Sequence, residues 1–197
     1  MKKQVIIIHG GDSFDSYDEF LDSLKNWEVS IDSFLSRNDW KSNLPKDLGE
    51  GFEVLSPRMP NKQNAKYEEW RLWFERMIPF ISNEAVFIGH SLGGIFLVKY
   101  LSENKYPKKI LKIILVAPPH NQTPETGSFK LEKSLDKVWE QCQNIHIFHS
   151  DDDPIVPVSE AKKYQSDWPK ANLQIFKNRG HFNQEYFPEI VKKVKEK

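Results

Sequence analysis

Short apolar runs alternate along the chain with longer stretches in which apolar residues recur every three or four positions. The short runs have the length of β-strands, and the longer stretches have the period of amphipathic helices. Strands are expected over residues 4–9, 52–56, 85–90, 110–116, 145–149 and 173–176, and helices over 16–27, 66–81, 92–103, 129–143, 158–166 and 185–195. This alternation of strand and helix predicts an α/β fold.

Several of the expected strands are apolar at consecutive positions, as in Val5-Ile6-Ile7-Ile8 and Ile113-Ile114-Leu115-Val116. A strand of this kind is covered on both faces, which is typical of a parallel sheet between two layers of helices. We therefore expect a three-layer α/β/α sandwich around a mostly parallel sheet of about six strands, joined by right-handed crossovers.

Residues 29–50 interrupt this pattern because they contain no convincing strand, carry many charges and are longer than an ordinary connection. We expect a small helical excursion here, with Asp32 through Arg37 as its helical turn. The segment could flank a ligand site, but a solvated connection is the commoner role for such a sequence. The chain has no internal repeat, low-complexity tract or Gly/Ser linker, so residues 1–197 are expected to form a single domain.

The charge balance argues against several classes of partner. The 197 residues include 28 Lys and Arg and 28 Asp and Glu, so there is no basic surplus to bind nucleic acid or an anionic membrane. No apolar run near the start is long enough for a membrane span or a signal peptide, which favours a cytoplasmic location. The single cysteine, Cys142, cannot form an internal disulfide and is interpreted as a structural thiol.

The sequence Gly89-His90-Ser91-Leu92-Gly93-Gly94 lies between an apolar strand and an apolar helix. This is the G-x-S-x-G pattern in the strand-turn-helix context where a nucleophilic serine needs it, because the strained turn leaves space only for small neighbours two residues before and after. Ser91 could instead be no more than the cap of the following helix. If it is a nucleophile, the backbone N–H of Leu92 is expected to stabilise the oxyanion at the amino end of that helix.

A nucleophilic serine requires a general base, and the base requires a carboxylate that orients it. His181 follows the last expected strand, and Asp151, Asp152 and Asp153 follow the strand before it. All of these residues are therefore expected at the carboxyl edge of the sheet, near Ser91. Asp153 precedes Pro154, which favours an extended conformation and projects its side chain into the loop. The triplet could also be only a turn signal before a helix.

The Ser-Asp-His order, the run Asp153-Pro154-Ile155-Val156-Pro157 and the turn Gly180-His181-Phe182 resemble the α/β-hydrolase superfamily. Within it, the small size and the lack of a cap domain resemble the compact serine hydrolases grouped with retinoblastoma-binding protein nine. The resemblance implies a compact α/β-hydrolase fold and a triad of Ser91, Asp153 and His181. It also places the second oxyanion N–H after the first strand, at Gly11, with Asp12 as the alternative.

Other histidines and glycines indicate no metal or nucleotide site. His146 and His149 would point to opposite faces of a strand, and so could not chelate one ion. His9 and His90 flank the two expected catalytic loops, and are interpreted as packing or hydrogen-bonding residues. The glycines match neither nucleotide-binding signature. No metal and no cofactor are expected.

The sequence thus predicts a metal-independent serine hydrolase that cleaves a small-molecule carboxylic ester, or alternatively an amide or thioester, through an acyl-enzyme on Ser91. Two other functions remain open. An acyltransferase would use the same triad with a different acceptor, and a non-catalytic protein-binding member would keep only the fold. No protein partner is indicated by the sequence.

Overall fold

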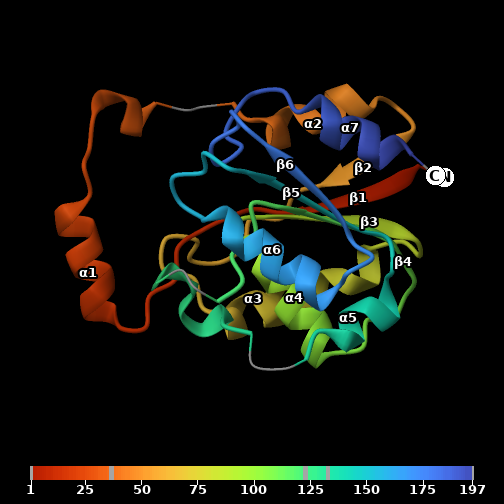
Figure 1. The fold of residues 1–197 in the computed structure, drawn as a ribbon, viewed down its shortest axis with the longest axis horizontal. Helices are drawn as coiled ribbons and strands as arrows, with labels where there is room; N and C mark the ends of the chain where they lie inside the picture. The colour runs from red at the N-terminus through yellow and green to blue at the C-terminus, as the bar shows by residue number, and fades with distance from the viewer. Residues whose placement is uncertain (1, 36–37, 122–123, 132–133, 197) are drawn as a thin grey trace.

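The computed structural model describes residues 2–35, 38–121, 124–131 and 134–196. Six strands form one sheet in the order β2-β1-β3-β4-β5-β6, and every neighbouring pair is parallel (Figure 1). The strands are β1 (Lys3–Ile8), β2 (Phe52–Leu55), β3 (Ala85–His90), β4 (Ile110–Val116), β5 (Ile145–Ser150) and β6 (Asn172–Phe176). The helices are α1 (Tyr17–Asn26), α2 (Trp40–Leu48), α3 (Tyr67–Met77), α4 (Leu92–Glu103), α5 (Asp136–Gln141), α6 (Val158–Asp167) and α7 (Pro188–Lys195), with 3-10 turns η1 (Ile31–Phe34), η2 (Ile78–Phe80) and η3 (Pro124–Phe129).

Helices cover both faces of the sheet, as the consecutive apolar residues of its strands predict (Figure 1). In β1, Val5 and Ile7 point to the face covered by α2 and α7, whereas Ile6 and Ile8 point to the face covered by α3, α4, α5 and α6. The predicted three-layer α/β/α sandwich is therefore confirmed.

Cys142, the cap residue of α5, is buried, and burial raises the pKa of its thiol to about 11.

The strand order reverses between β1 and β3, because the chain goes from β1 outward to β2 and then returns to β3 on the other side. In parallel α/β sheets, ligand sites form at the carboxyl ends of the strands at such a reversal. The loop after β1 carries Gly10 and Gly11, and the turn after β3 carries Ser91. The topology thus brings two distant segments together at one edge.

The segment between β1 and β2 differs from its expected structure. Its 3-10 turn η1 covers Ile31–Phe34, so the helical turn expected over Asp32 through Arg37 is only partly present, and Arg37 itself lies outside the described residues. The principal helix of the expected excursion over 29–50 is α2, which lies C-terminal to the helical turn that was expected. Trp40, Leu44 and Leu48 of α2 are buried against the sheet, so this part is not a solvated connection.

Helices α3, α5 and α7 are each shorter than their patterns predict by three residues or more. Helix α3 ends at Met77, where the 3-10 turn η2 follows. Helix α5 covers only Asp136–Gln141, and Phe129, the first residue of the expected helix, is the last residue of the 3-10 turn η3. Helix α7 begins at Pro188, since proline is well suited to the first position of a helix and poorly suited to its interior. Among the described residues, no helix is long and apolar enough to cross a membrane.

Candidate active site

Ser91 lies in a sharp turn between the fully buried strand β3 and helix α4. Its backbone has φ 53° and ψ −125°, a strained conformation for a residue that is not glycine. The turn is held by the Ser91 N–H, which donates to the Val116 carbonyl (2.8 Å), and by the Gly94 N–H, which donates to the Ser91 carbonyl (2.7 Å). Within the described part of the chain, the Ser91 hydroxyl makes no hydrogen bond, so it can turn toward a base or a substrate.

The two glycines of the pattern are required by close backbone approach. A Cβ added to Gly89 would lie 2.5 Å from the Gly93 carbonyl oxygen, and one added to Gly93 would lie 2.2 Å from the Ile8 carbonyl oxygen. Both distances are far below van der Waals contact, so α4 can pack directly on β1 and β3 only without these side chains. A Cβ on Gly10 would lie 3.0 Å from the Ser91 Cβ, so Gly10 also preserves space at the hydroxyl.

Asp153 and His181 meet at the same edge of the sheet, from the loops after β5 and β6. His181 Nδ1 lies 2.9 Å from Asp153 Oδ2, while Asp153 Oδ1 accepts hydrogen bonds from the N–H groups of Ile155 (2.8 Å) and Val156 (3.0 Å). The Asp153 side chain is completely buried. Burial favours a higher pKa for this carboxyl, but the hydrogen bond and charge of His181 and the two N–H groups outweigh it and lower the pKa. Asp153 is therefore held as a carboxylate facing the imidazole.

The two preceding aspartates have other roles. Asp152 Oδ1 accepts from the Ser150 hydroxyl (2.5 Å) and from the Gly180 N–H (3.0 Å), and the first of these bonds lowers the pKa of Asp152. Asp152 thus fastens the turn that precedes His181 without touching the imidazole. Asp151 is exposed and is joined to β6 through its backbone N–H, which donates to the Phe176 carbonyl.

The loop after β1 presents backbone N–H groups beside Ser91. The Asp12 N–H donates to the Lys62 carbonyl (2.8 Å) and is therefore not available to an oxyanion. A Cβ on Gly11 would lie 2.4 Å from the same carbonyl oxygen, so this close approach needs glycine. Gly11 lines the cavity beside Ser91, and both Gly11 and Leu92 line a smaller space next to Ser91. Of the two expected positions after β1, the geometry favours Gly11.

His9 and His90 are hydrogen-bonded parts of these loops. Because His9 Nε2 accepts from the Met59 N–H (2.9 Å), its proton is on Nδ1, which donates to the Gly10 carbonyl (2.6 Å). His90 Nε2 lies 2.9 Å from the His181 carbonyl oxygen, the geometry of a donated hydrogen bond. Burial lowers the pKa of both imidazoles, and that of His90 most strongly, so both are neutral at pH 7.

Helix α2 contacts the loop that carries His181. The Trp40 indole N–H donates to the Phe182 carbonyl (2.9 Å), the Trp40 backbone N–H donates to the Gln184 carbonyl (2.8 Å), and the Asn43 side chain donates to the Glu185 carbonyl (3.0 Å). The helix begins at a capping box in which Asp39 accepts from the backbone and Ser42 returns the bond. Through these hydrogen bonds, helix α2 holds the loop that carries His181 in place at one side of the site.

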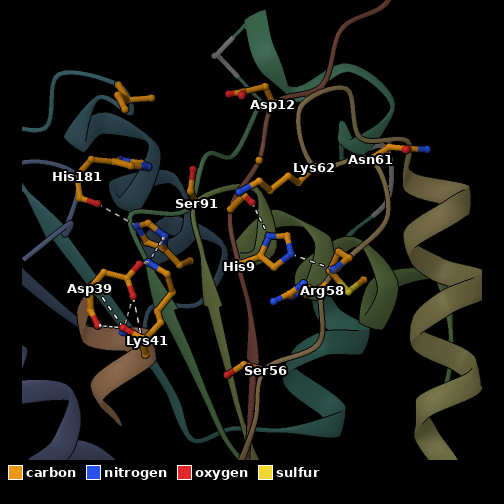
Figure 2. Close-up of a pocket in the computed structure, with 16 residues that line it drawn as sticks. His9, Asp12, Asp39, Lys41, Ser56, Arg58, Asn61, Lys62, Ser91 and His181 are labelled. Carbon is orange, nitrogen blue, oxygen red and sulfur yellow. Dashed lines mark hydrogen bonds and ion pairs between the residues drawn. The ribbon is translucent and has the colours of Figure 1, made fainter. Parts of the chain in front are cut away.

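These loops surround a cavity of about 1100 Å³. Figure 2 shows Ser91 and His181 on one side, with the imidazole pointing toward Ser91, and the side chains of Lys41, Arg58 and Lys62 entering from other sides. Lys41 Nζ forms an ion pair with Asp39 (2.5 Å) and lies 3.5 Å from His90 Nδ1. Burial lowers the pKa of Lys41, and the nearby charge of Lys62 lowers it further.

The structure thus brings together all five residues expected at the site: Ser91, Asp153, His181, Gly11 and Leu92. It also adds residues that the sequence reasoning missed. The signal for α2 was present, since Asp39 and Ser42 have capping-box spacing around an isolated tryptophan. For Arg58 and Lys62 the sequence offers no signal, because lysine and arginine in a polar loop are usually solvated.

The described residues contain no group of three His, Cys, Asp or Glu side chains that could hold a metal ion. His146 and His149 both lie in β5 and have separate partners. His146 Nε2 lies 2.9 Å from Asn144 Oδ1, and His149 Nε2 lies 2.8 Å from the Val156 carbonyl oxygen.

Residues 35–190 match the model of a family described as serine hydrolase. The chain is 28% identical to the serine hydrolase RBBP9 of Rattus norvegicus over 164 residues, which are 82% of this chain and 87% of that protein. It is 26% identical to the putative hydrolase YdeN of Bacillus subtilis over 191 residues, covering 92% and 87% of the two chains.

Solved structures have the same fold. The ydeN gene product of B. subtilis superposes with a TM-score of 0.77 at 22% identity, over 97% of this chain and 96% of that one. MGS-M2, an α/β hydrolase from a deep-sea metagenome library, superposes with a TM-score of 0.65 at 11% identity, over 98% and 88%. At these identities the likeness establishes a shared α/β-hydrolase fold.

Proposed function

The chain belongs to the serine hydrolase family, and from this premise we propose that it cleaves a carboxylic ester through an acyl-enzyme on Ser91. In this proposal His181 is the general base and acid, and Asp153 orients it. The N–H groups of Gly11 and Leu92 stabilise the oxyanion. The observation that carries the proposal is the 2.9 Å hydrogen bond between the buried Asp153 carboxylate and His181 Nδ1, in a cavity that Ser91 also lines.

The chemistry follows from the positions of the protons. Because Nδ1 donates to Asp153, Nε2 carries the lone pair that accepts the Ser91 hydroxyl proton while the Ser91 oxygen attacks the acyl carbon. The carbonyl oxygen becomes an oxyanion at the Leu92 and Gly11 N–H groups. Collapse of this intermediate breaks the ester bond, and His181 returns the proton to the departing alcohol. Water then attacks the acyl-enzyme by the same steps and releases the acid.

Labelling with a fluorophosphonate probe tests the nucleophile. The wild-type protein should be labelled, and Ser91→Ala should lose labelling and lower ester turnover by roughly 10³-fold or more. Ser56→Ala is a matched control, because Ser56 presents another hydroxyl to the same cavity and its variant should still be labelled. An unlabelled wild-type protein would contradict the proposal and favour a non-catalytic binding role.

The adjacent aspartates test the orienting carboxylate. Asp153→Asn should lower turnover by roughly 10³- to 10⁴-fold, because the amide cannot hold the same imidazole tautomer. Asp152→Asn should cost much less, since an amide oxygen can still accept from Ser150 and Gly180. The exposed Asp151→Asn should be close to wild type. If Asp152→Asn were the most damaging, the assignment of Asp153 would be wrong.

The proposed reaction uses only side chains and backbone groups of this chain. EDTA should therefore leave ester turnover unchanged, as measured before and after dialysis against the chelator. Loss of turnover that a divalent ion restores would contradict the metal-independent mechanism.

A further inference from the structure

Two spaces of different size meet at Ser91. The larger has a volume of about 1100 Å³ and the smaller about 100 Å³, and Ser91, Gly11, Asp12 and Ile155 line both. His181 lines the larger space only, whereas Leu92 lines the smaller one only. Ser91 therefore lies between two spaces that differ in chemistry, since one contains the proposed general base and the other contains a proposed oxyanion residue.

This arrangement sets the direction in which an ester would bind. The departing alcohol must receive its proton from His181, so the alcohol portion belongs in the larger space. The acyl portion then occupies the smaller space, beside Leu92, Pro119 and Val156. The smaller space has a volume of about 100 Å³, against about 1100 Å³ for the larger one, so the shorter portion of the ester is placed there.

Most of the side chains that line the larger space are polar or charged, and three of them are cations. The apolar side chains in its lining are Met59 and Ile155, whereas Lys41, Arg58 and Lys62 all contribute to it. In Figure 2 the Lys62 side chain extends toward Ser91, whereas Arg58 and Lys41 lie on opposite sides of the cavity. Positive groups grouped in a concave site focus the field and attract an anion.

Two carboxylates and three cations line the cavity, so the formal charge of its lining is positive. Asp39 is the partner of Lys41 (2.5 Å) and also accepts from the first N–H groups of α2. Asp12 also lines the cavity, and its backbone N–H donates to the Lys62 carbonyl (2.8 Å). Arg58 and Lys62 form no ion pair with any residue that the structure describes. Two cations thus face the cavity without forming an ion pair to any of these residues, although the Asp12 carboxylate lines the same space.

The segment that carries Arg58 and Lys62 is attached firmly to the loop after β1. The Met59 N–H donates to His9 Nε2 (2.9 Å), and the Lys62 carbonyl accepts from the Asp12 N–H (2.8 Å). These two bonds lie beside the two cationic residues and join them to the loop that presents Gly11. The backbone that carries the two cations is therefore held at a fixed position relative to the proposed oxyanion site.

We propose that the substrate is a short-chain acyl ester of an anionic alcohol, such as a hydroxycarboxylate, whose negative group is bound by Lys62 and Arg58 in the larger space. This proposal rests on the ester hydrolysis proposed above and adds the substrate class. A long-chain or uncharged alcohol gains nothing from this cationic wall.

The test compares two substrates that differ in one charge. 4-Acetoxybutanoate and its neutral analogue 4-acetoxybutanamide are hydrolysed by wild-type protein, and released acetic acid is followed by pH-stat titration. The value of kcat/KM should be about tenfold or more higher for the carboxylate, as expected for charge-assisted contacts. This preference should fall as salt is added, because ions screen the attraction. Methyl hemisuccinate, which carries its carboxylate on the acyl side, should be a poor substrate.

Variants locate the effect. Lys62→Gln and Arg58→Gln should each lower the ratio of the two kcat/KM values several-fold toward one. Lys170→Gln removes an exposed charge before β6, at the opposite edge of the sheet, and should leave the ratio unchanged. Circular dichroism checks that each variant is folded.

The outcomes separate this inference from the proposed function. Equal kcat/KM values for the two substrates, or turnover of 4-nitrophenyl acetate without turnover of either, would overturn the anionic substrate and leave ester hydrolysis intact. A preference for methyl hemisuccinate would overturn the assigned direction of binding. A wild-type protein that cleaves none of these esters would contradict the proposed function itself.

Discussion

Two helical segments are inserted between β1 and β2, and they differ in what their apolar residues do. Helix α2 buries Trp40, Leu44 and Leu48 against the sheet. The first segment, α1 with η1, has no buried residue in α1, and Figure 1 shows it extending away from the layers of the sandwich. Its large apolar side chains, among them Leu24, Trp27, Val29, Ile31 and Phe34, are exposed. Amphipathic spacing therefore predicts a helix but does not predict its burial.

The difference has a consequence for the site. Trp40 donates to the Phe182 carbonyl next to His181, so packing of α2 and position of the histidine loop are coupled. The described contacts of α1 include no such bond to that loop. We expect changes in α2 to affect both stability and turnover, and changes in α1 to affect neither strongly.

The largest difference in stability is expected when the tryptophan of each segment is replaced by alanine. Trp40→Ala should lower the free energy of unfolding by about 3–5 kcal/mol, because it leaves a large cavity beneath α2. Trp27→Ala, at a half-exposed position beside α1, should change it by less than about 0.5 kcal/mol. Urea denaturation followed by circular dichroism measures both. Similar losses in the two variants would contradict the comparison.

Trp40→Phe separates packing from the hydrogen bond, since it keeps an aromatic ring and removes the indole N–H. Unfolding should cost about 1 kcal/mol less free energy than in the wild-type protein. Ester turnover should fall by more than this loss of stability explains, if the bond to Phe182 positions His181. Unchanged turnover would show that the rest of α2 is sufficient.

Acidic pH should lower the free energy of unfolding, in part through a buried histidine that packs against α2. His90 lies under Trp40, with ring centroids 6.1 Å apart, and burial holds its pKa well below the ordinary 6.5. A lowered histidine pKa contributes stability that is complete above pH 6.5 and is lost as the pH falls. Burial also lowers the pKa of His146, to about 4, so the loss should continue down to that pH.

The expected slope is about 1.4 kcal/mol per pH unit for each such histidine below pH 6.5. Urea denaturation at pH 7.5, 6.0 and 5.0 measures it, and His90→Gln should remove one histidine's share. Residues 13–35 contain no histidine, so Trp27→Ala should keep the wild-type slope. A free energy of unfolding that does not change over this range would be inconsistent with neutral buried imidazoles.

Removing the cap of α2 and removing the cap of α1 should also change the free energy of unfolding by different amounts, although both losses are smaller. Asp39 caps α2 and Ser16 caps α1, each through side-chain acceptance of backbone N–H groups. Asp39→Ala should lower the free energy of unfolding by about 1 kcal/mol, and Ser16→Ala by at most a few tenths, because fraying of α1 exposes no buried surface. Thermal unfolding with circular dichroism distinguishes the two. A greater loss for Ser16→Ala would show that α1 is packed.

The smallest effect on global stability is expected from cutting the first segment. Brief trypsin treatment should cleave after Lys25 in α1 before it cleaves after Lys46 in α2, because α1 can open locally without unfolding the core. Mass spectrometry identifies the site. The nicked protein should keep its denaturation midpoint and its fluorophosphonate labelling. Loss of either would show that α1 supports the core or the site.

The elements that the sequence predicted well are those whose signal is local. The consecutive apolar residues of β3 and β4 require cover on both faces, and the helix expected over 92–103 has the observed bounds, because strong periodicity and a required turn coincide there. Ser91, Asp153 and His181 could be placed at one edge because they follow strands of a parallel sheet, although their catalytic roles remain predictions.

The tertiary structure was needed wherever the outcome depends on contacts between distant segments. Residues 40–48 and 17–34 are both amphipathic, yet only the first meets a hydrophobic surface, supplied by β-strands and α7. Arg58 and Lys62 have no local feature that separates them from solvated surface cations. They face the cavity because His9 and Asp12 hold the backbone of their loop in place. Local patterns encode the period and bounds of an element, whereas burial and charge clustering arise from residues far apart in the chain.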